Sequence, residues 1–197
     1  MSKSKSQSWV VLYFALGIVW GCSFIFIKLG LEFLTPFGVA FGRCALGALA
    51  LLVFLKVKKL SIVRDRAMIG HLWVVALLLN VIPGIFFAWA ETEVTSILAG
   101  IINAVTPLMT LIAIILVTRH ERPTAPQIVG LLLGFLGVLT VLGAWQGLGD
   151  NPLWAILVLL AAVTCYGFSF PYSRRFILPA NLEPEVMAAT QVSLAAL

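Results

Sequence analysis

Six stretches of about twenty predominantly apolar residues, separated by short polar connections, make up most of this sequence. A helix needs roughly 20 apolar residues to cross the hydrocarbon core of a bilayer. Inside a bilayer each backbone polar group must find a partner within the chain, and a helix meets this condition within one segment. The predicted spans are residues 9–31, 36–57, 71–91, 94–118, 127–145 and 152–173, and a seventh begins near Leu182. We therefore predict an all-α polytopic membrane protein.

The composition agrees with this prediction. The chain is 61% hydrophobic and 11% charged, whereas soluble domains are roughly 45–50% apolar and about 25% charged. Lys3 and Lys5 precede the first span, as they would in a signal peptide. That span is too long for a signal sequence, and no cleavage site of small residues follows it, so we interpret it as a retained helix.

The charged residues predict the orientation in the membrane. If the N-terminus is cytoplasmic, the cytoplasmic segments hold eleven of the thirteen Lys and Arg residues, and the opposite connections hold the acidic Glu32, Glu91, Glu93 and Asp150. This asymmetry follows the positive-inside rule, so we predict a multi-pass protein of the cell (plasma) membrane with a cytoplasmic N-terminus. The net charge of +5 is interpreted as a topology signal, and nucleic acid is not an expected partner.

Two segments of the sequence repeat each other at an offset of 146 residues. "WGCSFIFIK" (20–28) aligns with "YGFSFPYSR" (166–174), which pairs Gly21 with Gly167. Five predicted spans separate the copies, and because five is odd the second copy must enter the membrane from the opposite side. The pattern predicts inverted repeats of five helices each.

These repeats set the expected domain boundaries. Residues 1–149 form the first repeat, and residues 150–197 begin a second, incomplete one. By the repeat register Leu197 falls in the middle of a helix, where carbonyl groups would end without partners. We therefore expect a ten-helix transporter fold that is truncated here after six helices and the start of a seventh.

Two long segments resemble the EamA transporters of the drug/metabolite transporter superfamily. They are "WGCSFIFIKLGLEFLTPFGVAFGRCALGALALL" and "SILAGIINAVTPLMTLIAIILVTRHERPTAPQIVGLLLGFLGVLTVL". The landmarks are a Trp-Gly in helix one, an Arg in helix two, a central Pro in helix four, a Glu-Arg before helix five and spaced Gly residues within it: Trp20, Gly21, Arg43, Pro107, Glu121, Arg122, Gly130, Gly134 and Gly137. One departure is Gln191, which stands where the first repeat has Arg43.

The resemblance implies a two-repeat secondary transporter, usually an exporter of small metabolites such as amino acids or of drugs. Its expected partners are a small-molecule substrate and the lipid bilayer. No cofactor is expected, and the sequence leaves open whether the protein forms a homo-dimer. The alternative is a non-transporting membrane subunit or a truncated relic of such a transporter.

Span four carries a polar stripe. Ser96, Gly100, Asn103, Pro107 and Thr110 recur every three or four residues and therefore share one face, with Thr106 beside the proline. Polar groups are costly against lipid, so this face is expected to line protein or a water-filled cavity. Pro107 has no N–H, which frees the carbonyl of Asn103 as an acceptor in a substrate pathway. The alternative is a simple kink, with Asn103 bonded to a neighbouring helix.

Span three holds a second proline, and span two a charge. Asn80 precedes Pro83, which frees the carbonyl of Leu79 and predicts a second broken helix. Arg43 lies about 10 Å inside its span at the helical rise, so it should face inward, either towards a substrate carboxylate or towards backbone carbonyls. Lys28, near the end of span one, is expected to reach the headgroups.

Aromatic and small residues complete the candidates. Trp20 and Tyr166 occupy nearby repeat positions and either line the cavity or pack in the core. Three G-x-x-x-G pairs are expected to let helices approach closely: Gly17/Gly21, Gly38/Gly42 and Gly130/Gly134.

Enzyme motifs are weak or absent. "GLGD" (147–150) matches intramembrane aspartyl proteases, but Asp150 and Asp65 fall on opposite sides of the predicted membrane and cannot form the required pair. No zinc-binding H-E-x-x-H or nucleotide-binding G-x-x-x-x-G-K-[ST] run occurs. The three cysteines have no metal-like spacing and are interpreted as packing residues. We predict no enzymatic activity, no catalytic residue and no metal.

Overall fold

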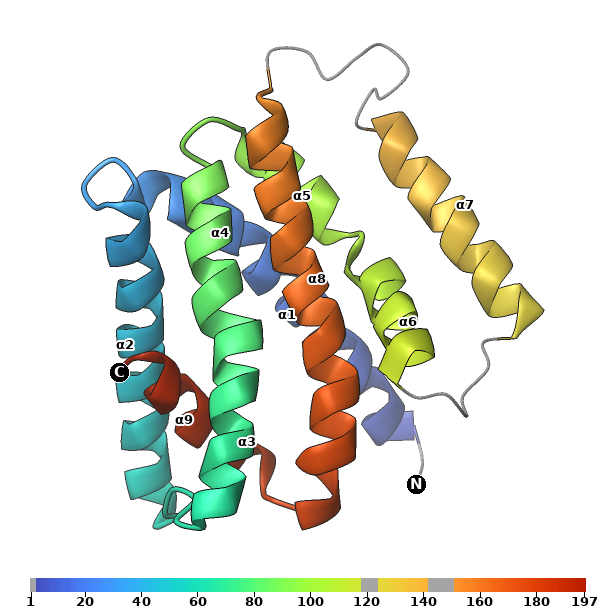
Figure 1. Ribbon diagram of the computed structural model, residues 1–197. Coiled ribbons are helices and arrows are strands. Elements are labelled where there is room, and N and C mark those ends of the chain that lie inside the picture. The colour runs from blue at the N-terminus through green and yellow to red at the C-terminus, as the bar shows by residue number, and fades with distance from the viewer. Residues whose placement is uncertain (1–2, 118–123, 142–150) are drawn as a thin grey trace.

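The computed structural model describes residues 3–117, 124–141 and 151–197, and every regular element within these ranges is a helix (Figure 1). This confirms the predicted all-helical class for the described part of the chain. In chain order the elements are α1 (Lys3–Gly30), α2 (Pro36–Lys58), α3 (Arg66–Ala76), the π-helix η1 (Leu77–Val81), α4 (Ile82–Ala90), α5 (Ser96–Asn103), α6 (Thr106–Val117), α7 (Ala125–Val141), α8 (Leu153–Phe176), the 3-10 helix η3 (Leu178–Ala180) and α9 (Pro184–Ala195).

Five helical segments among the described residues are long and apolar enough to cross a membrane, and they match the first four predicted spans and the sixth. They are Val10–Gly30, Pro36–Lys58, Arg66–Ala90, Ser96–Val117 and Leu153–Ala180. The fifth predicted span contains the shorter apolar helix α7, and its residues 142–145 lie outside the described residues.

Local polar residues set where the helices begin. The Thr35 hydroxyl accepts a hydrogen bond from the Gly38 N–H at 3.2 Å, and Asp65 accepts one from the Met68 N–H at 2.8 Å. Such side chains satisfy N–H groups that have no partner in the first turn of a helix. Thr95 caps α5 in the same way. The short polar connections of the sequence therefore act as helix starts.

Span four is interrupted where the sequence predicts. α5 ends at Asn103 and α6 begins at Thr106, one residue before Pro107. The missing N–H of proline removes one backbone bond, and the chain turns through Ala104 and Val105. Figure 1 shows the offset between the two half-helices.

The second predicted break, at Pro83, is wrong. α3, η1 and α4 form one continuous helix, in which Leu77–Val81 adopts the wider π-helical form. The Ile82 N–H donates to the carbonyl of Leu77, five residues back. Because a π-turn accommodates one extra residue, the backbone passes the proline without opening.

α8 packs between α4 and α6 and holds the bundle together (Figure 1). Its buried face contributes Ala155, Leu159, Ala162 and Val163 to a core that also contains Phe87 of α4. At Gly167 the contact with α6 is very close, since a Cβ added there would lie 2.6 Å from the carbonyl carbon of Met109. Only a residue without a side chain fits at this crossing.

The predicted G-x-x-x-G contacts do not form within the described part of the chain. At Gly17, Gly21, Gly42, Gly130 and Gly134, no atom of another segment lies within 4 Å of the position that a Cβ would take. Gly38 contacts only neighbouring residues of its own helix start. Glycine permits a close approach of two helices only where a second helix packs against it. Among the described glycines the closest approach is at Gly167, against Met109 of α6.

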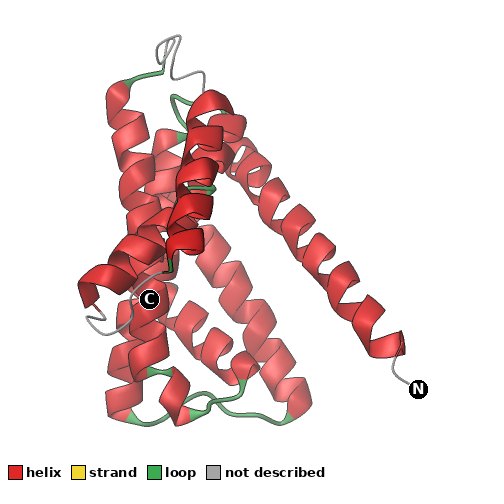
Figure 2. Ribbon diagram, turned by 90° about the vertical axis from the view of Figure 1, so that its right-hand side faces the viewer, coloured by secondary structure: helices red, strands yellow, loops and turns green. Residues whose placement is uncertain are grey.

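α1 diverges from the other helices. It meets them near its C-terminal end, around the connection to α2, and leans away towards the N-terminus (Figure 2). Its residues from Val11 to Val19 include seven large apolar side chains that are at least 56% exposed. α8 runs in the direction opposite to α1 (Figure 1).

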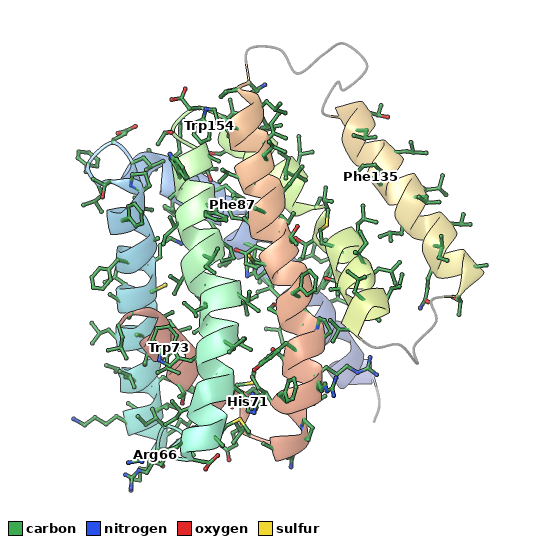
Figure 3. All side chains as sticks on the ribbon, in the orientation of Figure 1. Arg66, His71, Trp73, Phe87, Phe135 and Trp154 are labelled. Carbon is green, nitrogen blue, oxygen red and sulfur yellow. The ribbon has the colours of Figure 1, made fainter. Side chains whose placement is uncertain are left out.

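α9 closes the other side of the bundle, against α2 and α3. The Thr190 hydroxyl accepts a hydrogen bond from the Val63 N–H at 3.1 Å and donates one to the Val186 carbonyl at 2.8 Å. A second buried cluster lies nearby, formed by Val63, Leu72, Val75 and Ile177. Figure 3 places His71 and Arg66 at this lower end and Trp154 at the opposite end.

Candidate functional site

A cavity of about 1270 Å³ opens beside the interrupted span, between α1, α5, α6, α7 and α8. Six of the eight residues predicted to form the site line it: Trp20, Asn103, Thr106, Pro107, Thr110 and Tyr166. A volume of this order can hold a small metabolite. Three residues of the polar stripe of span four, Asn103, Pro107 and Thr110, thus face this cavity, which is one of the two surroundings expected for the stripe.

The interruption orients polar groups along the cavity wall. The Thr106 hydroxyl donates to the Asn103 carbonyl at 2.7 Å, and the Thr110 hydroxyl donates to the Thr106 carbonyl at 2.9 Å. The carbonyl predicted to be a free acceptor therefore already has one partner, which is the hydroxyl of its own chain three residues ahead. A carbonyl oxygen has two lone pairs, so it retains the capacity for a second bond.

The other two predicted residues, Arg43 and Asn80, line a second cavity of about 380 Å³ between α2, the π-helix, α8 and α9. The Arg43 guanidinium donates to the Ser23 hydroxyl of α1 at 2.9 Å. The Asn80 amide nitrogen is buried and has no hydrogen-bond partner among the described residues. This chamber therefore presents hydrogen-bond donors from two helices.

Tyr166 and Leu79 line both cavities and lie between them. The Tyr166 ring stacks on Phe87, with ring centroids 6.0 Å apart and an interplanar angle of 22°. Tyr166 therefore does both things that the sequence left as alternatives: it lines the cavities, and its ring packs in the core. Trp20 is 56% exposed and lines the larger cavity from α1.

Sequence reasoning missed several lining residues. Thr124, Gln127, Phe170 and Arg174 also line the larger cavity. Gln127 follows Pro126 and Phe170 precedes Pro171, but neither residue belongs to a polar stripe in its span, and the packing of α7 and α8 brings them to the cavity. The motif residues Glu121 and Arg122 and the "GLGD" segment lie outside the described residues.

The largest correction concerns Lys28 and Glu91. The Lys28 ammonium does not extend to the headgroups, since it donates to the main-chain carbonyls of Glu91 and Val94. Glu91, expected in a polar connection, is fully buried, and its carboxylate accepts a hydrogen bond from the Ser96 hydroxyl at 2.9 Å. Burial raises the pKa of Glu91 from its ordinary value of 4.5 to about 7, against the opposing effects of Ser96, Lys28 and Arg43.

Metal binding finds no support in the described part of the chain, where no group of three or more His, Cys, Asp or Glu side chains is placed to hold an ion. The polar groups along both cavities are hydroxyls, amides, a phenol and guanidinium groups. Such groups bind and orient a solute by hydrogen bonds and charge.

These features define a polytopic helical membrane protein with a cavity that opens beside an interrupted span. The family model for the EamA-like transporter family matches residues 7–143. The chain belongs to the EamA-like transporter family, and it is a multi-pass membrane protein.

Its curated relatives are named as transporters. The chain is 29% identical over 169 residues to the "Uncharacterized inner membrane transporter YedA" of Escherichia coli (strain K12), a match that covers 86% of this chain and 54% of that protein. It is 26% identical over 135 residues to an "Uncharacterized transporter" of Archaeoglobus fulgidus, covering 68% of this chain and 47% of that protein. The chain thus spans about half the length of the relatives it matches. No solved structure matches it significantly.

Proposed function

We propose that this chain is part of a secondary transporter that exports small metabolites, such as amino acids or drugs, across the cytoplasmic membrane by alternating access. The single observation that carries the proposal is the cavity of about 1270 Å³ beside the interrupted span, lined by polar groups of α5 and α6. A broken helix beside a cavity presents backbone and side-chain groups to a solute at a depth where lipid offers none. The family of the chain and the names of its relatives support this class of function.

The substrate class follows from the smaller chamber. Arg43 supplies the positive charge there, and the unpartnered Asn80 amide supplies a second donor. Guanidinium and amide donors together suit a carboxylate. Metabolites with a carboxylate, such as amino acids, are therefore the proposed cargo.

Inverted repeats and a cytoplasmic N-terminus belong to the same proposal. α8, the counterpart of α1 in the sequence repeat, runs antiparallel to α1, which agrees with an inverted second copy (Figure 1). The basic connection between α2 and α3 lies at the end opposite the acidic α4–α5 turn (Figure 1), as the positive-inside rule requires for this orientation. Cysteines introduced at Arg64 and at Glu93 and probed with an impermeant thiol reagent in intact cells test it: only the Glu93 position should react from outside.

The test of function is efflux of radiolabelled amino acids from cells that express the chain, both as it stands and joined to a complete second repeat. Arg43→Ala should abolish efflux of carboxylate substrates. Arg64→Ala, in an exposed connection, is the matched control and should retain it. Absence of efflux for all substrates in both well-expressed proteins would instead favour a non-transporting membrane subunit.

A further inference from the structure

Glu91 is the most completely buried acidic side chain among the described residues, with 0% of its surface exposed. One carboxylate oxygen, Oε2, accepts the Ser96 hydroxyl at 2.9 Å. The other, Oε1, is buried and has no hydrogen-bond partner in the part of the chain that the structure describes. Burying an ionised carboxylate with an unsatisfied oxygen is costly, so this environment favours binding of a proton.

The charged neighbours of Glu91 leave its carboxylate only partly compensated. From α1, Lys28 directs its ammonium to the carbonyls of Glu91 and Val94. From α2, Arg43 adds a more remote positive charge and donates to Ser23. Glu93 lies in the same turn, and Glu32 lies in the α1–α2 connection. α5 (Ser96–Asn103) and residues 153–164 of α8 contain no charged side chain.

The Ser96 hydroxyl stands between two acceptors, one in the turn after α4 and one on α1. Its oxygen lies 2.9 Å from Glu91 Oε2 and 3.2 Å from the main-chain carbonyl oxygen of Phe24 in α1. A hydroxyl has one hydrogen to donate, so it favours the stronger acceptor. When Glu91 is ionised, that acceptor is the carboxylate.

Protonation reverses this arrangement. A proton taken up from water converts the Glu91 carboxylate into a carboxylic acid, and no other bond forms or breaks. The new O–H donates to Ser96 Oγ, and the Ser96 hydrogen turns to the Phe24 carbonyl. The hydrogen bond then joins α5 to α1 instead of α5 to the end of α4.

The α1–α5 contact lies beside the candidate site. A third cavity, of about 570 Å³, separates the two helices and is lined by Phe24 and Ser96. It shares Trp20, Asn103 and Ala104 with the larger cavity. A change in how α5 holds α1 therefore changes a wall of the proposed substrate pathway, and towards its N-terminus α1 leans away from the other described helices (Figure 2).

We propose that Glu91 is a proton-binding site that controls, through Ser96, the attachment of α1 to α5, and that this couples proton binding to the proposed transport. The coupling to transport rests on the proposed function, whereas the proton site and its effect on α1 do not. The raised pKa of Glu91, about 7, places the transition near neutral pH.

The first measurement is an infrared pH titration of the purified protein in lipid vesicles, following the carbonyl band of protonated carboxylic acids. The wild type should show one acid that titrates near neutral pH. Glu91→Gln should lose this band, and Glu93→Gln, an exposed acid in the same turn, should keep it. Ser96→Ala should keep the band with a higher midpoint, because the hydrogen bond that stabilises the carboxylate is gone. No band near neutral pH, or a band that survives Glu91→Gln, would overturn the proton site.

The second measurement is the distance between spin labels at Leu12 on α1 and Leu116 on α6, both exposed, with the three native cysteines replaced by serine. The distance distribution should change between acidic and alkaline pH. It should be independent of pH in Glu91→Gln and in Ser96→Ala. A change that persists in Ser96→Ala would overturn the role of Ser96. Neither readout needs substrate. If the wild type shows the infrared titration of Glu91 but no efflux, the proposed function is refuted and the proton site stands.

Discussion

A single methyl group added at Gly167 of α8 would disturb the contact between α8 and α6. A Cβ at this position would lie 2.6 Å from the Met109 carbonyl carbon, 2.8 Å from its Cβ and 2.8 Å from its carbonyl oxygen, whereas ordinary contacts begin at 3.4 Å. In Gly167→Ala the two helices must therefore separate by about 0.8 Å, the difference between 3.4 and 2.6 Å. The contact atoms are mostly backbone and cannot rotate away.

The energetic effect has two opposing parts. Overpacking costs about 1–3 kcal/mol, and a backbone clash belongs at the upper end. Replacing Gly by Ala inside a helix returns about 0.5–1 kcal/mol. The net expectation for Gly167→Ala is a loss of about 2 kcal/mol in the free energy of unfolding.

The assay is unfolding in mixed detergent micelles, with helicity followed by circular dichroism. Gly42→Ala in α2 is the matched control, because nothing lies within 4 Å of its added Cβ, and it should be at least as stable as the wild type. Equal stability of the two variants would refute the close contact between α6 and α8.

Three further outcomes are expected. Thr190→Val leaves the buried Val63 N–H without an acceptor and should destabilise the protein by about 1–3 kcal/mol in the same assay, whereas Thr140→Val, which loses only a bond to its own helix, should have a smaller effect. Asn80→Leu removes a buried unpartnered donor, so stability should be unchanged or higher while efflux of carboxylate substrates falls; a large loss of stability would contradict this. Because the pKa of Glu91 is higher in the folded protein than its ordinary value, wild-type stability should fall as pH rises from about 4.5 to about 7, and Glu91→Gln should flatten this slope.

Much of the candidate site could be predicted from the sequence because its signals are local. The interruption at Asn103 follows from one missing N–H at Pro107, and the stripe that faces the cavity follows from helical spacing. Two features depend on neighbouring helices and could not be predicted: the position of Tyr166 in the walls of both cavities, and the lining residues from α7.

The errors have a common cause. Pro83 carries the same local signal as Pro107, yet span three widens into a π-turn while span four opens. The sequence shows that a backbone bond is missing, but the surrounding packing decides how the helix responds. Within the described residues the predicted contacts of the glycine pairs are missing for a similar reason, since a small residue allows a close approach only where another helix packs against it.

The sequence by itself determined that the chain lies in a lipid bilayer, that it is helical and approximately where its spans lie. Hydrophobic length and backbone hydrogen bonding in a bilayer act over single segments, so one stretch of sequence is enough to predict each span. Only the tertiary structure decided the environment of Glu91. Its carboxylate is buried because α1 and α5 close over the turn, and Lys28, 63 residues away in the sequence, donates to the main-chain carbonyl of Glu91. Burial and charge compensation depend on which segments meet in space, and that information is not contained in any one stretch of the chain.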